Sequence, residues 1–180
     1  MKIKIGVMGS AETERPTSNE LRRSAVALGQ AVASRNAILL TGGTTGLVYI
    51  VGKAARDAGA FHVGVSPGSS ETEHIERYQL PTDACDLLIY TGFGLKGRNV
   101  VLVRSCDIVL FIGGAMGSLN EFTIAHDEDK VIGCLTGTGG VADEVDYLLE
   151  KFSKRTGCVL KHDDPILLID ECLTTFNKNT

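Results

Sequence analysis

The sequence contains no tryptophan, few aromatic residues (6%) and only four prolines among its 180 residues. It also lacks a long hydrophobic run, because the first apolar stretch already ends at Gly9, too early for a signal peptide or a spanning helix. We therefore expect a cytoplasmic protein. Its net charge of -4 leaves no excess of Lys and Arg to attract nucleic acid or an anionic membrane, and we expect neither as a partner.

Cysteine pairs and histidine clusters are missing as well. The cysteines are odd in number, widely scattered and never spaced as C-x-x-C, which excludes a disulfide framework and a zinc ribbon. Each lies in or beside an apolar run, so we expect buried free thiols. The four histidines are dispersed too, and we predict no metal site. These residues are Cys85, Cys106, Cys134, Cys158, Cys172, His62, His74, His126 and His162.

Short apolar runs that alternate with helical patterns are what the sequence does contain. With 43% hydrophobic residues and no linker or low-complexity tract, residues 1–180 read as a single domain. Alternating strands and helices predict an α/β fold: a three-layer, doubly wound, Rossmann-like parallel sheet of about seven strands with helices on both faces. The predicted strands span residues 3–8, 37–41, 61–65, 85–90, 107–112, 131–135 and 158–160.

Two helical segments depend on specific signals. Thr17 and Glu20 have the spacing of a capping box, which predicts that the first helix begins there. Residues 98–103 are locally ambiguous, because their β-branched side chains favour a strand. Two parallel strands need a crossover of a dozen or more residues, however, so we predict a short helix with Arg98 at its N-terminal end.

Glycine-rich turns follow most of the predicted strands. In a doubly wound sheet these turns gather at the carboxyl edge, where such folds bind their ligands. The clearest turn, residues 113–117, is followed by a predicted helix that contains Glu121. The N–H groups that open a helix have no internal partner and bind anions well, so the pattern predicts a phosphate site. Among these turns, residues 137–140 have the best claim to a purely structural role.

Two common nucleotide motifs are absent from these turns. The first turn, residues 9–11, lacks the G-x-G-x-x-G fingerprint of dinucleotide-binding folds, and no acidic residue closes the second strand. No glycine cluster continues into Gly-Lys-Ser or Gly-Lys-Thr, which excludes a P-loop. Classical NAD binding and ATP hydrolysis are therefore not expected.

Taken together, four motifs resemble those of the LOG family, within the wider SLOG group of Rossmann-like nucleotide-binding proteins. They are GGTTGL at 42–47, VGVSPG at 63–68, Gly-Arg-Asn at 97–99 and the turn at 114–121. The resemblance extends from about Ile3 to Phe152. It implies a phosphoribohydrolase, which needs no cofactor and splits the base from a nucleoside 5′-monophosphate, and a homodimer or higher homo-oligomer. The frequent label "lysine decarboxylase" does not suit this chain, which has no pyridoxal-phosphate signature.

The resemblance also implies roles for particular residues. Arg98 would neutralise charge or orient the ribose, and Glu121 would stabilise an oxocarbenium-like centre or activate water. A helix N-terminus lowers the pKa of a nearby carboxyl group, so we expect Glu121 to be ionised. The ligand-binding and phosphate-binding residues would be Gly9, Ser10, Gly42, Gly43, Thr44, Thr45, Gly46, Pro67, Gly68, Asn99, Gly113, Gly114, Ala115, Met116, Gly117 and Ser118.

One departure from the LOG pattern keeps a second function open. The usual Arg-Lys pair is Arg98-Asn99 here, a form that looks more like a sub-branch containing the molybdenum cofactor carrier proteins. Those proteins bind a phosphorylated pterin without needing to hydrolyse it. The ligand is thus either a nucleoside monophosphate or a phosphorylated pterin, held by a hydrolase or by a non-catalytic carrier or sensor.

Four apolar residues on two predicted helices, Val100, Val103, Leu119 and Phe122, suit a subunit interface as in the resembling family. The core of a monomer would use the same pattern.

Overall fold

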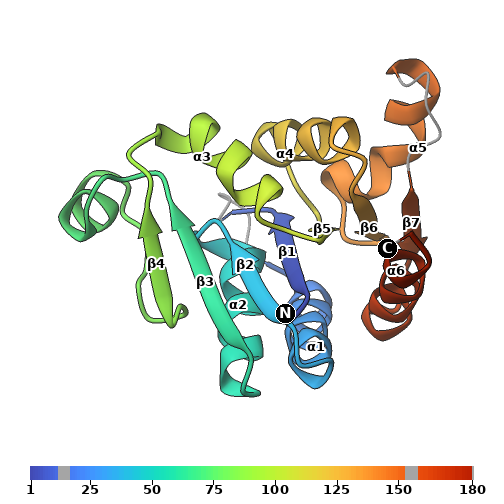
Figure 1. Ribbon diagram of the computed structural model, residues 1–180, viewed down its shortest axis with the longest axis horizontal. Coiled ribbons are helices and arrows are strands. Elements are labelled where there is room, and N and C mark those ends of the chain that lie inside the picture. The colour runs from blue at the N-terminus through green and yellow to red at the C-terminus, as the bar shows by residue number, and fades with distance from the viewer. Residues whose placement is uncertain (12–16, 153–157, 180) are drawn as a thin grey trace.

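Seven parallel strands form one sheet in the order β4-β3-β2-β1-β5-β6-β7 (Figure 1). The computed structural model describes residues 1–11, 17–152 and 158–179. The strands are β1 (Lys4–Gly9), β2 (Ile38–Thr41), β3 (Phe61–Ser66), β4 (Leu87–Tyr90), β5 (Ile108–Ile112), β6 (Val131–Leu135) and β7 (Val159–His162). The predicted parallel sheet is confirmed.

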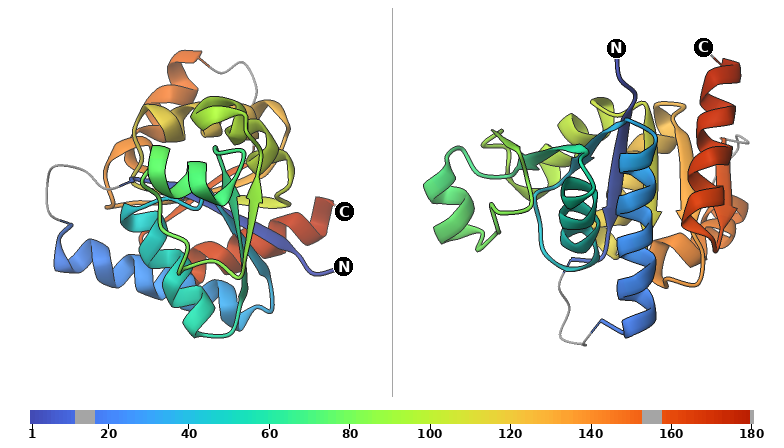
Figure 2. Two further views of the ribbon diagram at one scale, coloured as in Figure 1. Left: turned by 90° about the vertical axis from the view of Figure 1, so that its left-hand side faces the viewer. Right: turned by 90° about the horizontal axis from the view of Figure 1, so that it is seen from below.

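Helices cover both faces of this sheet. Figure 1 shows α3, α4 and α5 above it and α1, α2 and α6 below it, and the view from below in Figure 2 places the second group in front of the strands. The three-layer, doubly wound architecture is therefore confirmed. The helices are α1 (Asn19–Ser34), α2 (Gly46–Asp57), α3 (Gly94–Arg104), α4 (Met116–Asp127), α5 (Gly140–Phe152) and α6 (Pro165–Asn179), and a single π-helical turn, η1, spans Glu73–Arg77.

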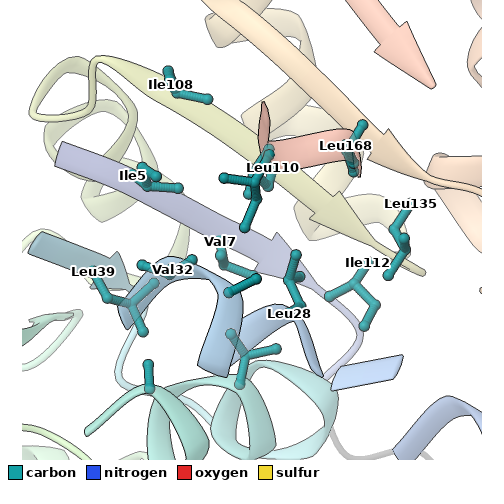
Figure 3. Packing of buried hydrophobic residues seen from close by; sticks show 14 of the residues in the cluster. Ile5, Val7, Leu28, Val32, Leu39, Ile108, Leu110, Ile112, Leu135 and Leu168 are labelled. Atoms are coloured by element: carbon teal, nitrogen blue, oxygen red, sulfur yellow. The ribbon is translucent and has the colours of Figure 1, made fainter. Parts of the chain in front are cut away.

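The core consists of two layers, one on each face of the sheet. Ile5 and Val7 of β1 pack with Leu28 and Val32 of α1, and Figure 3 shows this packing from close by. Met8 faces the other layer, because successive side chains of a strand point to opposite faces. Strand β5, next to the central strand β1, is buried along its whole length, as expected for a parallel sheet covered on both sides.

The strand order reverses between β1 and β5. The chain runs outward from β1 through β2 and β3 to β4, then returns to β5, which pairs with β1 on its other side. Gly9 lies opposite Ile112 in this pairing, and a Cβ on Gly9 would lie 2.1 Å from the Ile112 carbonyl oxygen. Only glycine fits there, so the turns after β1 and β5 meet at the point where such sheets bind ligands.

Two predicted helix starts differ from the structure. Ser18, not Thr17, caps α1, because the Ser18 hydroxyl accepts a hydrogen bond from Leu21 N at 3.2 Å. The segment 98–103 is helical as predicted, but α3 begins at Gly94 and Arg98 lies in its middle. Gly92, just before the helix, and Gly94, its first residue, both have positive φ, so the chain turns there and the helix begins four residues before Arg98.

Three of the four residues predicted for a subunit interface belong to the core of the single chain. Val103 and Phe122 are buried, and Leu119 packs against the same cluster, whereas Val100 is exposed. A homo-oligomer therefore stays a prediction. Within the described residues no helix is long and apolar enough to cross a membrane.

Candidate functional site

A pocket of about 170 Å³ opens at the carboxyl ends of β1 and β2, between α3 and α4. It lies beside the reversal of strand order, as the glycine-rich turns predict. The predicted site residues that line it are Gly9, Gly42, Thr44, Arg98, Asn99, Gly117, Ser118 and Glu121. Its volume is below the roughly 300–1,000 Å³ of typical ligand pockets, so a nucleotide-sized ligand would be only partly enclosed.

The N-terminus of α4 forms one wall of the pocket. Its first internal hydrogen bond runs from Leu119 N to the Ala115 carbonyl, at 2.9 Å, so the preceding main-chain N–H groups have no partner inside the helix. Ala115, at the capping position, offers no side chain to bind them. The Ser118 hydroxyl is turned away to the Gly9 carbonyl, at 3.1 Å. The positive end of this helix is therefore available to an anion.

Lys96 adds a positive charge at the same place. A Cβ built on Gly117 would lie 3.6 Å from Lys96 Nζ, so the ammonium group is next to the first turn of α4. Lys96 lines the pocket and is exposed. An ammonium group and a helix N-terminus that face the same space favour a negatively charged ligand.

Arg98 is buried without the partners that a buried guanidinium needs. Its exposed fraction is 6%, and among the described residues its Nε finds no hydrogen-bond partner. Burial lowers the pKa of Arg98, and the charge of Glu121 opposes that shift. The side chain fits only because residue 42 is glycine: a Cβ there would lie 1.7 Å from Arg98 Nη1. Buried polar groups are nearly always paired, so this donor is available to an acceptor that enters the pocket.

Glu121 faces the pocket with only 8% of its surface exposed. Burial raises the pKa of Glu121 to about 7, although the charges of Arg98 and Lys96 oppose this shift. The prediction of a lowered pKa is wrong. The helix dipole acts most strongly on the first turn of α4, and Glu121 lies beyond that turn. The loss of water around the carboxyl group therefore outweighs the effect of the dipole on its pKa.

Asn99 connects Glu121 to the neighbouring helices. With its amide nitrogen turned toward Glu121, it donates to Glu121 Oε1 at 3.1 Å and to the Leu95 carbonyl at 3.0 Å. Its amide oxygen then accepts from the Asn120 amide at 2.8 Å, provided that the Asn120 nitrogen takes the place of Oδ1. In the opposite orientation the Asn99 nitrogen donates to Asn120 Oδ1 at 2.8 Å and to the Gly117 carbonyl at 3.5 Å, but its oxygen then faces the Leu95 carbonyl, which cannot donate. Among the described residues, Glu121 is therefore held by an amide and not by an ion pair.

The turn after β5 is built from predicted site residues that do not line the pocket. Ser10 Oγ accepts a hydrogen bond from Gly114 N at 2.8 Å, and Gly113 N donates to Thr138 Oγ1 at 2.8 Å. The Gly114 carbonyl accepts from Val141 N at 3.0 Å. The main-chain donors of Gly113 and Gly114 are thus used within the protein, and this turn shapes the site.

The remaining predicted site residues do not line the pocket. Gly43 N and Gly68 N donate to the hydroxyls of Thr41 and Ser66, at 3.1 and 3.0 Å, which fixes the turns after β2 and β3. The structure brings Thr45 and Gly46 to a separate groove, next to η1, while Pro67 accepts a main-chain hydrogen bond from Gly94 and Met116 is exposed.

Several pocket residues were not predicted from the sequence: Val7, Met8, Ala11, Val48, Leu95 and Lys96. A signal existed for Lys96 and Leu95. They lie three and four residues before Asn99, a spacing that places side chains on one face of a helix.

Comparisons with known proteins agree with this architecture. The model of the SLOG cluster4 family matches residues 2–169. An uncharacterized protein of Archaeoglobus fulgidus is 30% identical over 133 residues, which cover 74% of this chain and 80% of that protein. The fold is similar to the molybdenum cofactor carrier protein of Chlamydomonas reinhardtii (26% identity, TM-score 0.79, 100% of both chains). It is also similar to the molybdenum cofactor binding protein of Rippkaea orientalis (26% identity, TM-score 0.75, 99% of this chain and 97% of that one).

Proposed function

Because this chain belongs to the SLOG cluster4 family, we propose that it binds a phosphorylated small molecule at the carboxyl edge of its sheet. The observation that carries this proposal is the buried guanidinium of Arg98, whose Nε has no partner among the described residues and which faces the same pocket as Lys96. Together with the uncapped N-terminus of α4, these groups suit a phosphate.

The ligand that we favour is a phosphorylated pterin of the molybdenum cofactor type, carried without being consumed. Two solved structures with similar folds are described as molybdenum cofactor carrier or binding proteins. The pocket would enclose the phosphate and the adjoining atoms, while the ring system would extend outside it. A nucleoside monophosphate has the same phosphate end and is the other ligand class that this pocket suits.

A second candidate function is hydrolysis of a nucleoside 5′-monophosphate, and Glu121 is the observation that favours it. A carboxyl group with a pKa of about 7 gains and loses a proton near neutral pH, as a general acid or base must. It would accept a proton from water as the oxygen bonds to the anomeric carbon. The bond to the base breaks in the same step, and the departing nitrogen takes the proton that Glu121 accepted from water, so that the free base and ribose 5-phosphate are released.

Binding and turnover can be separated in one set of measurements. Calorimetric titration with molybdopterin, AMP and isopentenyladenosine monophosphate measures binding, and chromatography of the same mixtures detects free base. Lys96→Ala should weaken binding by about tenfold or more, because a charge-assisted contact to phosphate is lost. Lys2→Ala is the matched control, since it removes an exposed lysine just before β1, at the opposite edge of the sheet.

The outcomes distinguish the two candidates. Binding of molybdopterin without base release from either nucleotide supports a carrier. Base release by the wild type, lost in Glu121→Gln, supports the hydrolase. If none of the three ligands binds, or if Lys2→Ala weakens binding as much as Lys96→Ala does, the proposed site is wrong.

A further inference from the structure

Glu121 and the anion-binding groups share one small pocket. Glu121 lines the same volume of about 170 Å³ as Lys96, Arg98 and the first turn of α4. An ionised carboxylate and a phosphate dianion repel each other strongly when little water separates them. The pocket therefore contains one group whose negative charge opposes the ligand that its other groups favour.

The positive charges in the pocket do not compensate both anions. Among the described residues that line the pocket, Lys96 and Arg98 carry one positive charge each, and the N-terminus of α4 adds about half a charge, so a dianion and an ionised Glu121 together exceed the positive charge. Among the described residues neither cation forms an ion pair with Glu121. The Cys106 thiol also interacts with Glu121, and burial raises the pKa of Cys106 to about 12, so this thiol stays neutral.

Within the part of the chain that the structure describes, the other elements that line the pocket contribute no charge near Glu121. β1 offers Val7 and Met8, and the turn and first residues around α2 offer Thr44 and Val48. The direct contact of Glu121 is the amide of Asn99, at 3.1 Å. Unlike a lysine, an amide can serve both forms of the carboxyl group, because its nitrogen donates to a carboxylate and its oxygen accepts from a carboxylic acid.

We propose that Glu121 takes up a proton when the phosphorylated ligand binds, so that the pocket receives its dianion together with one proton. This inference rests on the proposed function of the pocket. In the complex Lys96 and Arg98 balance the dianion, and the neutral carboxyl group of Glu121 donates a hydrogen bond to Asn99 or to the ligand. Binding therefore weakens as the pH rises. When the ligand dissociates, Glu121 releases its proton to solvent.

Sulfate is the probe that tests this step, because its charge stays at minus two between pH 6 and 8.5 whereas phosphate itself titrates there. Calorimetric titration at constant ionic strength, in two buffers with different ionisation enthalpies, gives the number of protons bound per sulfate. Because burial raises the pKa of Glu121 to about 7, proton uptake should approach one per sulfate at pH 8.5. The affinity should fall by about 30-fold from pH 6 to 8.5, in proportion to the protonated fraction.

Glu121→Gln provides the matched variant, since it is neutral at every pH and nearly the same shape. It should bind sulfate with no proton uptake and with an affinity that does not change with pH. The ¹³C chemical shift of the Glu121 carboxyl group gives a second measurement on the wild type. Its titration midpoint should move to higher pH when sulfate is added, because linkage is reciprocal.

The results separate this inference from the function on which it rests. If sulfate binds without proton uptake, if Glu121→Gln keeps the pH dependence, or if the carboxyl midpoint is unchanged by sulfate, the proton-linked step is wrong and the anion site stands. If sulfate binds at no pH in the range, the anion site is wrong and the proton-linked step falls with it.

Discussion

Gly42 and Arg98 should be energetically coupled, and this coupling tests the construction of the site without any ligand. A methyl group at position 42 would lie 1.7 Å from Arg98 Nη1, well inside van der Waals contact, so Gly42→Ala forces the guanidinium out of its place. The backbone at Gly42 is not in the left-handed region, so strain of the main chain does not contribute. Overpacking of this kind costs about 1–3 kcal/mol of unfolding free energy.

In an Arg98→Ala background the guanidinium is absent, so the methyl group of Gly42→Ala no longer overlaps with it. Gly42→Ala should then cost about 0.5 kcal/mol or less, which makes the coupling energy about 1–2 kcal/mol. Urea unfolding of the four proteins in the double-mutant cycle measures it, provided that the dependence on urea stays constant. Gly117→Ala is the control in the same pocket, because its Cβ would make only an ordinary contact, 3.6 Å from Lys96 Nζ. Equal costs of Gly42→Ala in both backgrounds would refute the argument.

Two further predictions concern the scaffold around the site. Ser18→Ala should lower the unfolding free energy by about 0.5–2 kcal/mol, because the hydrogen bond that caps Leu21 N is lost. Thr17→Ala should leave the midpoint of urea unfolding nearly unchanged. A larger effect of Thr17→Ala than of Ser18→Ala would contradict the assignment of the cap. Burial lowers the pKa of His62, so stability should be fully present above about pH 6.5 and should decline as the pH falls below that value, since the unfolded chain then binds the extra proton. Urea midpoints between pH 7.5 and 5 should fall less steeply in His62→Gln, and an unchanged slope would show that His62 is not the group responsible.

The fold could be predicted from the sequence because its signals are local. Each strand is a short apolar run that ends in glycine, and each following helix repeats apolar residues at helical spacing, so the alternation of elements needs no knowledge of distant contacts. Residues 98–103 were the exception, since propensity favoured a strand, and the need for a crossover decided correctly for a helix. The exact helix starts depend on which hydroxyl reaches which N–H, and a spacing rule does not resolve Thr17 from Ser18.

The electrostatics of the site could not be predicted in the same way. Position in a helix suggested an ionised Glu121, but the pKa depends on how α3 and β1 close over the side chain and remove its water. Lys96 was missed for a similar reason. Lys96 lies close to Gly117 because helices α3 and α4 pack against each other, and no sequence motif signals that contact.

The same packing implies that ligand binding and stability are linked in this protein. Arg98 is taken out of water without a full set of partners, and a buried donor left unpaired costs about 1–3 kcal/mol. That cost destabilises the ligand-free protein and is removed when an anion accepts the hydrogen bonds.

A ligand that binds only the folded chain stabilises it by about 2.7 kcal/mol when its concentration is one hundred times its dissociation constant. For a chain of this length that is a rise of roughly 5–10 °C in the unfolding temperature. A thermal shift with a candidate ligand, much reduced in Lys96→Ala and retained in Lys2→Ala, would therefore report occupancy of this pocket, whereas a shift of equal size in Lys96→Ala would place the ligand elsewhere on the protein.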